Sequence, residues 1–262
     1  MPDEAKMFTT FLEKHRRAPF ADKGEKPWTY CGWLLFYVQG WHADPTFPFP
    51  DRWGYLHAFL VSPYDPGPIP KVHFEAPSDE ARKHLENCIL EVESKHGSWS
   101  GFSLLVDWLL YGCGISKEPS TLEDSLQEKL YKTFNAGLLL QAPYDYFGAI
   151  ISERKGSGKW NPTKFFPTPH PVCELMAQMS FHDMGEFASR FRMMNDCCMG
   201  TGRMQMHAGN YSLMLSGADI DPLVLKCAKL NGVFFVPWLV YPVEEPPFFI
   251  SKKPAKRKVA FF

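Results

Sequence analysis

A turn with two glycines near the C-terminal end of the chain places the strongest constraint on its fold. The turn has the sequence Cys-Cys-Met-Gly-Thr-Gly-Arg-Met over residues 197–204 and follows the apolar run Phe191–Met194. A chain that passes sharply from a strand into a helix beneath a ligand needs backbone conformations that favour glycine, and Gly200 and Gly202 supply them. We therefore expect a short buried strand over Phe191–Met194. We also expect a helix over Arg203–Ala208, whose N-terminal amides suit an anionic group.

A second motif follows this turn and supports the same site. The apolar run Leu213–Ala218 predicts another short strand, which ends at Asp219. In nucleotide-binding α/β folds, an acidic residue about twenty positions after the glycine turn accepts hydrogen bonds from ribose hydroxyls. Asp221 and Pro222 are typical of an N-cap and a first helical residue, which predicts a helix over Leu223–Leu230. The alternative is that both aspartates are turn and capping residues alone.

A third segment lies upstream, over residues 164–179, with the sequence Lys-Phe-Phe-Pro-Thr-Pro-His-Pro-Val-Cys-Glu-Leu-Met-Ala-Gln-Met. In order with Asp-Cys-Cys-Met-Gly-Thr-Gly-Arg-Met and Gly-Ala-Asp-Ile-Asp-Pro, it resembles the N6-adenine DNA methyltransferases, especially the modification subunits of type I restriction systems. The stretch Phe102–Gly148 also looks like the helical segment that precedes the methyltransferase core in that family. The resemblance covers roughly residues 100–240.

The resemblance implies an α/β fold with a partial Rossmann-like domain that binds S-adenosylmethionine. The residues implied to bind this cofactor are Phe166, Thr168, Pro169, Asp196, Cys198, Gly200, Gly202, Asp219 and Ile220. Phe166 and Thr168 would flank the methionine end. Asp219 would bind the ribose, and Ile220 would pack on the adenine. The chain departs from the family pattern at Pro167, which is an additional residue before Thr-Pro, and at residues 197–199, which replace the commoner Pro-Ala-Cys.

The catalytic motif of the family has no full match in this chain. Those enzymes hold a flipped adenine with an Asn/Asp/Ser-Pro-Pro-Tyr/Phe loop after the fourth strand. The nearest candidate is Glu245, in the sequence Glu-Glu-Pro-Pro-Phe-Phe at residues 244–249. We expect a third strand over Phe234–Val240, so the motif would follow the third strand. In a 3-2-1-4-5 sheet the third strand lies about 10 Å from the first, whereas the fourth lies beside the first, so the motif would be on the wrong side of the donor methyl group. Glu245 can act as the catalytic residue only if a strand-helix unit has been deleted, so that Phe234–Val240 is equivalent to the fourth strand. Otherwise Pro246 and Pro247 form a rigid exit from the last strand.

Two functions therefore remain open. The first is an S-adenosylmethionine-dependent N6-adenine DNA methyltransferase, which would pass the methyl group directly to a flipped adenine. The second is a cofactor-binding remnant or subunit without catalysis of its own, which a partner chain completes. DNA and a partner subunit are the partners that these functions imply.

Composition agrees with a cytoplasmic protein of this kind. The 262 residues are 45% apolar, enough for one sizeable core or two small ones. A formal net charge of −1 gives no general support to DNA binding. The seven cysteines lack metal-ligand spacing, so we expect reduced thiols and no metal site. No signal peptide is recognised, and no apolar run is long enough for a membrane helix.

The sequence divides into five parts: a mixed N-terminal region of unknown role (1–100), a helical segment (101–151), a hinge (152–163), the methyltransferase-like cofactor-binding domain (164–250) and a basic tail (251–262). In the first part, Tyr30–Val38 and Tyr55–Val61 are predicted to be strands. Ser78–His96 is predicted to be an amphipathic helix. Its buried face comprises Ala81, Leu85, Cys88, Ile89 and Val92. We interpret the histidines and tryptophans of this part as structural residues.

Overall fold

The computed structural model of the chain describes residues 26–61, 65–156 and 165–243 and is mostly helical. Its elements in chain order are η1 (Pro27–Thr29), α2 (Trp33–Ala43), α3 (Arg52–Val61), α4 (Asp79–His96), α5 (Ser98–Gly112), α6 (Asp124–Thr133), α7 (Ala136–Gln141), α8 (Tyr146–Gly156), α9 (His170–Phe181), α10 (Glu186–Ser189), β1 (Met194–Asp196), α11 (Arg203–Ala208), β2 (Leu215–Gly217), α12 (Pro222–Phe235) and α13 (Pro237–Val240). The two strands form a parallel sheet in which Met194 pairs with Leu215.

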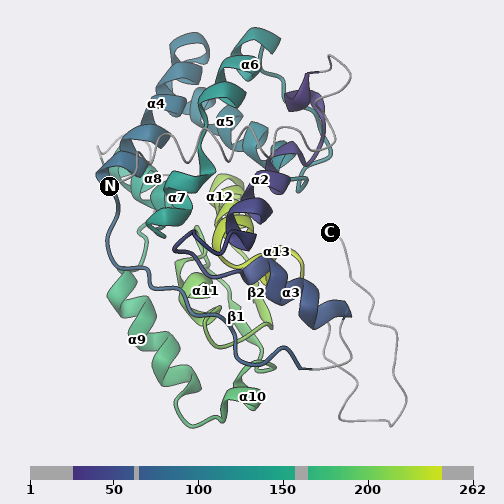
Figure 1. Ribbon diagram of the computed structural model, residues 1–262. Helices are drawn as coiled ribbons and strands as arrows, with labels where there is room; N and C mark the ends of the chain where they lie inside the picture. Colours follow the sequence, from purple (N-terminus) through teal and green to yellow (C-terminus); the bar gives the residue numbers. More distant parts are fainter. Residues whose placement is uncertain (1–25, 62–64, 157–164, 244–262) are drawn as a thin grey trace.

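Helix α12 is the central element of the molecule. Figure 1 shows α4, α5 and α6 at one end, α9 and α10 at the other, and α12 between them. α12 packs against α5, α7 and α8 on the side of the helical segment, and against α11 beside the sheet. Helix α12, which follows the Asp-Pro motif, therefore connects the sheet region to helices α5, α7 and α8.

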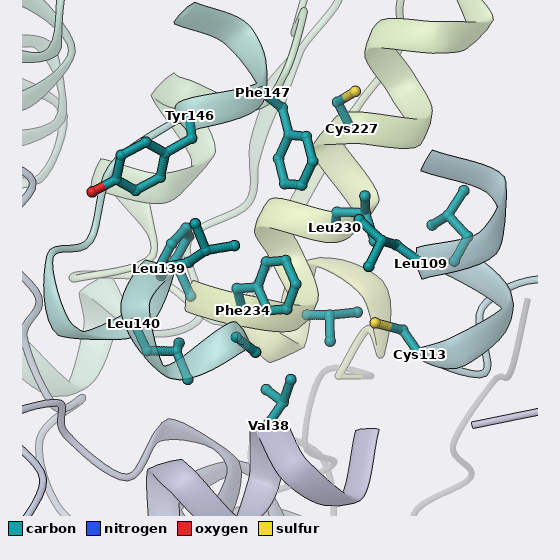
Figure 2. Packing of buried hydrophobic residues seen from close by; sticks show 14 of the residues in the cluster. Val38, Leu109, Cys113, Leu139, Leu140, Tyr146, Phe147, Cys227, Leu230 and Phe234 are labelled. Carbon is teal, nitrogen blue, oxygen red and sulfur yellow. The ribbon is translucent and has the colours of Figure 1, made fainter. Parts of the chain in front are cut away.

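The apolar core is continuous through the described parts of the chain. Figure 2 shows Phe234 and Leu230 of α12 among Val38, Leu109 and Phe147, which come from α2, α5 and α8. One cluster of buried apolar residues extends in this way from Trp33 to Val243. Described parts of residues 1–100, 101–151 and 164–250 all contribute to it.

Two segments that we predicted to be strands are helical. Tyr30–Val38 spans the turn after η1 and the first half of α2, and Tyr55–Val61 lies in α3. α2 contacts α3, α5 and α7, so several of its faces are covered. A short apolar run buried in this way has no periodicity that separates a helix from a strand, and the prediction was wrong for that reason. The described part of the N-terminal region is helical, not mixed.

The helix predicted over Ser78–His96 is confirmed as α4. Ser78 is its N-cap, and the Ser78 hydroxyl accepts a hydrogen bond from the backbone N–H of Ala81 at 3.3 Å. Its buried residues are Ala81, Leu85, Cys88, Ile89 and Val92, as expected. Residues 152–156 of the predicted hinge belong to α8, and residues 157–163 lie outside the described residues.

The third strand predicted over Phe234–Val240 is also helical. Phe234 and Phe235 end α12, and Pro237–Val240 forms α13 with a proline at its first position. Residues 230–235, at the end of α12, are all buried, and the run Val233–Val236 is apolar on every side, so it looks like a buried strand. Within the described residues the sheet has two strands, where we expected a three-stranded core.

His42 makes the stability of this fold depend on pH. Its Nε2 lies 2.9 Å from the carbonyl oxygen of Phe234, and burial lowers the pKa of His42 to about 3. In the unfolded chain the His42 imidazole takes up a proton near pH 6.5, whereas in the folded chain it stays neutral at that pH. The contribution of His42 is therefore complete above pH 6.5 and decreases as the pH falls toward 3. Between pH 6.5 and 5 we expect a loss of about 2 kcal/mol from this residue.

Urea unfolding at pH 7 and pH 5 measures this loss. His42→Gln, whose side chain does not titrate, should reduce the difference between the two free energies of unfolding by about 2 kcal/mol. His57→Gln, at an exposed position of α3, is the matched control. An unchanged pH dependence in His42→Gln would show that burial does not lower the pKa of His42 in the folded chain.

Candidate cofactor-binding site

The glycine turn follows β1 and leads into α11 as predicted. Gly200 and Gly202 have φ angles of +55° and +82°, in the left-handed region that favours glycine. A Cβ on Gly200 would lie 2.7 Å from Cε2 of Phe165, so the Phe165 ring also excludes a side chain at this position. α11 covers Arg203–Ala208, which confirms the predicted helix.

The strands are shorter than predicted, and the first is displaced. β1 covers Met194–Asp196, whereas we predicted Phe191–Met194. The backbone N–H of Phe191 instead donates to the carbonyl oxygen of Ala188 in α10, so Phe191 lies in the turn before the strand. β2 lies within the predicted Leu213–Ala218. Since parallel strands share a carboxyl edge, the residues after β1 and β2 come together there.

Asp219 is fixed across the glycine turn. Its Oδ2 accepts a hydrogen bond from the backbone N–H of Gly200 at 2.9 Å, and its Oδ1 accepts one from the N–H of Asp221 at 2.9 Å. A carboxylate has about four acceptor positions, so these two bonds leave capacity for a ligand. Asp221 is the N-cap of α12 and accepts a hydrogen bond from Leu223. The capping interpretation thus holds for Asp221, whereas Asp219 also lines a cavity.

The three sequence segments meet around a cavity of about 300 Å³. Its lining residues are Phe165, Phe166, Pro167, Thr168, Asp196, Cys197, Cys198, Met199, Gly200, Thr201, Arg203, Met204, Asp219 and Ile220. The volume is at the lower end of the range for small-molecule sites. Phe166 and Ile220, which are 76% and 85% exposed, provide apolar surface at this cavity.

Most of the predicted cofactor residues line this cavity, and two do not. Phe166, Thr168, Asp196, Cys198, Gly200, Asp219 and Ile220 do so. Pro169 is instead the N-cap of α9, and its carbonyl accepts hydrogen bonds from Val172 and Cys173. Gly202 donates its N–H to the carbonyl of Met199 at 2.8 Å and starts α11. Pro169 and Gly202 therefore shape the walls without facing the cavity.

A buried polar network beneath the turn was not predicted. Asp145 is fully buried, and its Oδ2 accepts hydrogen bonds from the Thr201 hydroxyl at 2.5 Å and from Nε of Arg203 at 2.8 Å. Its Oδ1 accepts from Nδ2 of Asn231 at 2.8 Å and from the N–H of Gly148 at 2.8 Å. Arg203 directly follows the turn in the sequence, whereas its partner Asp145 lies 58 positions earlier, so no local pattern indicated the pair.

A pair of neutral histidines lies behind the same network. Nδ1 of His170, at the start of α9, is 3.0 Å from Nε2 of His207 on α11. Burial, with the positive charge of Arg203, lowers the pKa of His170 to about 3 and that of His207 to about 4. Both rings are therefore uncharged at neutral pH, and one donates its hydrogen bond to the other.

The charged groups of the cavity suit a cationic ligand better than acid-base catalysis. Asp196 and Asp219 line it, and the charge of Arg203 is compensated by Asp145. Interaction with the Cys197 thiol raises the pKa of Cys198, which favours the neutral thiol. Among the described residues that line the cavity, no histidine is present to act as a general base.

Other parts of the predicted site lie beyond what the structure describes. Glu245 and the basic tail over 251–262 are outside the described ranges. Within those ranges, no group of three or more acidic, histidine or cysteine side chains is placed to hold a metal ion. None of the described helices combines the length and apolar character needed to cross a bilayer.

Comparison with protein-family models, with curated proteins and with solved structures found no significant match to this chain.

Proposed function

We propose that this chain binds S-adenosylmethionine in the cavity at the carboxyl edge of the sheet, and that it is a relative of the N6-adenine DNA methyltransferases. One observation carries the proposal. Three segments that match the family pattern in sequence order line a single cavity, with Asp219 held across the turn by the N–H of Gly200.

The chemistry of the cavity supports this ligand. S-adenosylmethionine carries a ribose diol, a flat adenine and a positively charged sulfonium. The unused acceptor positions of Asp219 suit the diol, and the exposed side chain of Ile220 offers an apolar surface to the base. Asp196 provides a second carboxylate at the same cavity, which favours a cationic ligand.

Catalysis by this chain alone would need an acceptor group for the adenine amine. Glu245 is the candidate, and methyl transfer to a flipped adenine in DNA is the reaction it would serve. Within the described residues, however, no strand follows β2, and α13 occupies the place where we expected the last strand. This observation favours the second function, a cofactor-binding subunit whose catalytic loop comes from a partner chain.

Transfer of a labelled methyl group to DNA distinguishes the two functions. The purified chain is incubated with methyl-labelled S-adenosylmethionine and mixed-sequence DNA, and the label in N6-methyladenine is counted. An active methyltransferase should lose about a hundredfold or more in rate in the Glu245→Ala variant, because the acceptor is removed. Binding of the cofactor without transfer supports the subunit function. Transfer at the full rate by Glu245→Ala would exclude Glu245 as the catalytic residue.

A further inference from the structure

Arg203 joins two walls of the cavity that lie far apart in the sequence. Its backbone begins α11, directly after the glycine turn, and its side chain is 9% exposed. Nε donates to Asp145 at 2.8 Å, while Nη1 donates to the carbonyl oxygen of Thr168 at 3.2 Å. Thr168 lines the cavity and belongs to the segment before α9. The guanidinium therefore sets the separation between the turn and the Thr168 wall.

Asp145 anchors this connection to elements outside the cavity. It precedes α8, and its carboxylate is held by the N–H of Gly148 and by Asn231 of α12. Asn231 also donates to the carbonyl oxygen of Thr201, at 2.9 Å, so the turn is attached to α12 as well as to Asp145. Because the carboxylate has four donors and is fully buried, its position is closely determined.

Asp145 has a second effect, which is electrostatic. Arg203 lines the cavity, and its positive charge would repel a cationic ligand. The buried carboxylate of Asp145 compensates this charge at hydrogen-bond distance. The cavity is thereby left with the charges of Asp196 and Asp219, which attract a cation.

We propose that Asp145 and Arg203 are positioning residues that fix the width of the cavity, and that Asp145 determines its preference for a cationic sulfonium over a neutral thioether. The ligand class in this inference rests on the proposed function, whereas the positioning does not. S-adenosylmethionine is the sulfonium, and S-adenosylhomocysteine is the thioether that remains after methyl transfer.

Calorimetry with both ligands tests the preference. In Asp145→Asn the charge of Arg203 is uncompensated, so the ratio of the affinities for S-adenosylmethionine and S-adenosylhomocysteine should fall by about tenfold. Asp145→Asn combined with Arg203→Met removes both charges and the connection to Thr168. The ratio should then return to within about threefold of the wild-type value, while both affinities stay at least about tenfold weaker.

The double variant also guards against a failure to fold, because replacing both members of a buried ion pair by neutral groups is often tolerated. Asp107→Asn, in a surface pair with Lys226, is the matched control and should change neither affinity nor ratio. An unchanged ratio in Asp145→Asn would overturn the charge role. Wild-type affinities in the double variant would overturn the positioning role.

Hydrogen exchange separates this inference from the identity of the ligand. In the double variant without ligand, the amides of residues 198–202 should exchange at least about tenfold faster, while those of α4 keep their rates. If the wild-type chain binds neither ligand but the double variant shows this local change, the positioning holds and the proposed cofactor is wrong. Uniformly faster exchange would show that the pair serves general stability, and unchanged exchange would show that it does not hold the turn. Either result would overturn the positioning.

Discussion

Replacing Asp219 by alanine is expected to weaken the binding of S-adenosylmethionine by about a hundredfold or more. Hydrogen bonds between a carboxylate and the two ribose hydroxyls contribute about 1.5–3 kcal/mol each, so their loss accounts for an effect of this size. The variant also leaves the N–H of Gly200 without its acceptor, which loosens the turn. Calorimetric titration of wild type and variant measures the change.

Asp183→Ala is the matched control for this experiment. Asp183 lies between α9 and α10, is exposed, and is not among the residues that line the cavity. The control should bind with the wild-type affinity. An equal loss in both variants, or none in Asp219→Ala, would mean that Asp219 is only a turn residue.

The second large effect is on stability. Asp145→Ala should lower the free energy of unfolding by about 3–5 kcal/mol, because it leaves Arg203 as a buried charge without its partner. Thr201, Asn231 and Gly148 would lose a hydrogen-bond acceptor at the same time. Urea unfolding followed by circular dichroism measures this loss.

Asp107→Ala serves here as the matched control. Asp107 pairs with Lys226 at 2.7 Å, and both side chains are about 40% exposed. Such a surface pair contributes less than about 1 kcal/mol. If the two alanine variants lost the same stability, the buried network would have no special role in the fold.

Features that depend on local conformation could be predicted from the sequence. Gly200 and Gly202 lie where the backbone needs positive φ, and Asp221 caps its own helix, so each requirement is visible within a few residues. The buried face of α4 follows from its own periodicity. The cavity was predicted for the same reason, since its walls are sequence motifs.

Features that depend on tertiary packing could not be predicted. The apolar runs in α2 and α12 fit a strand or a helix equally well, and their neighbours in the fold decide between the two. Asp145 meets Thr201 and Asn231 across 56 and 86 positions of sequence, and no local pattern indicates those contacts. For these reasons the prediction of a third strand over Phe234–Val240 was wrong, and the buried network around Asp145 was not predicted.

Titration of the wild-type chain with S-adenosylmethionine tests the central proposal most directly. We predict a heat of binding that fits one site per chain. S-adenosylhomocysteine should compete for this site, whereas the dinucleotide NAD, which also contains an adenine nucleoside, should not. No heat at millimolar ligand, or competition by NAD as strong as that by S-adenosylhomocysteine, would contradict the assignment of this cavity to the methyl donor.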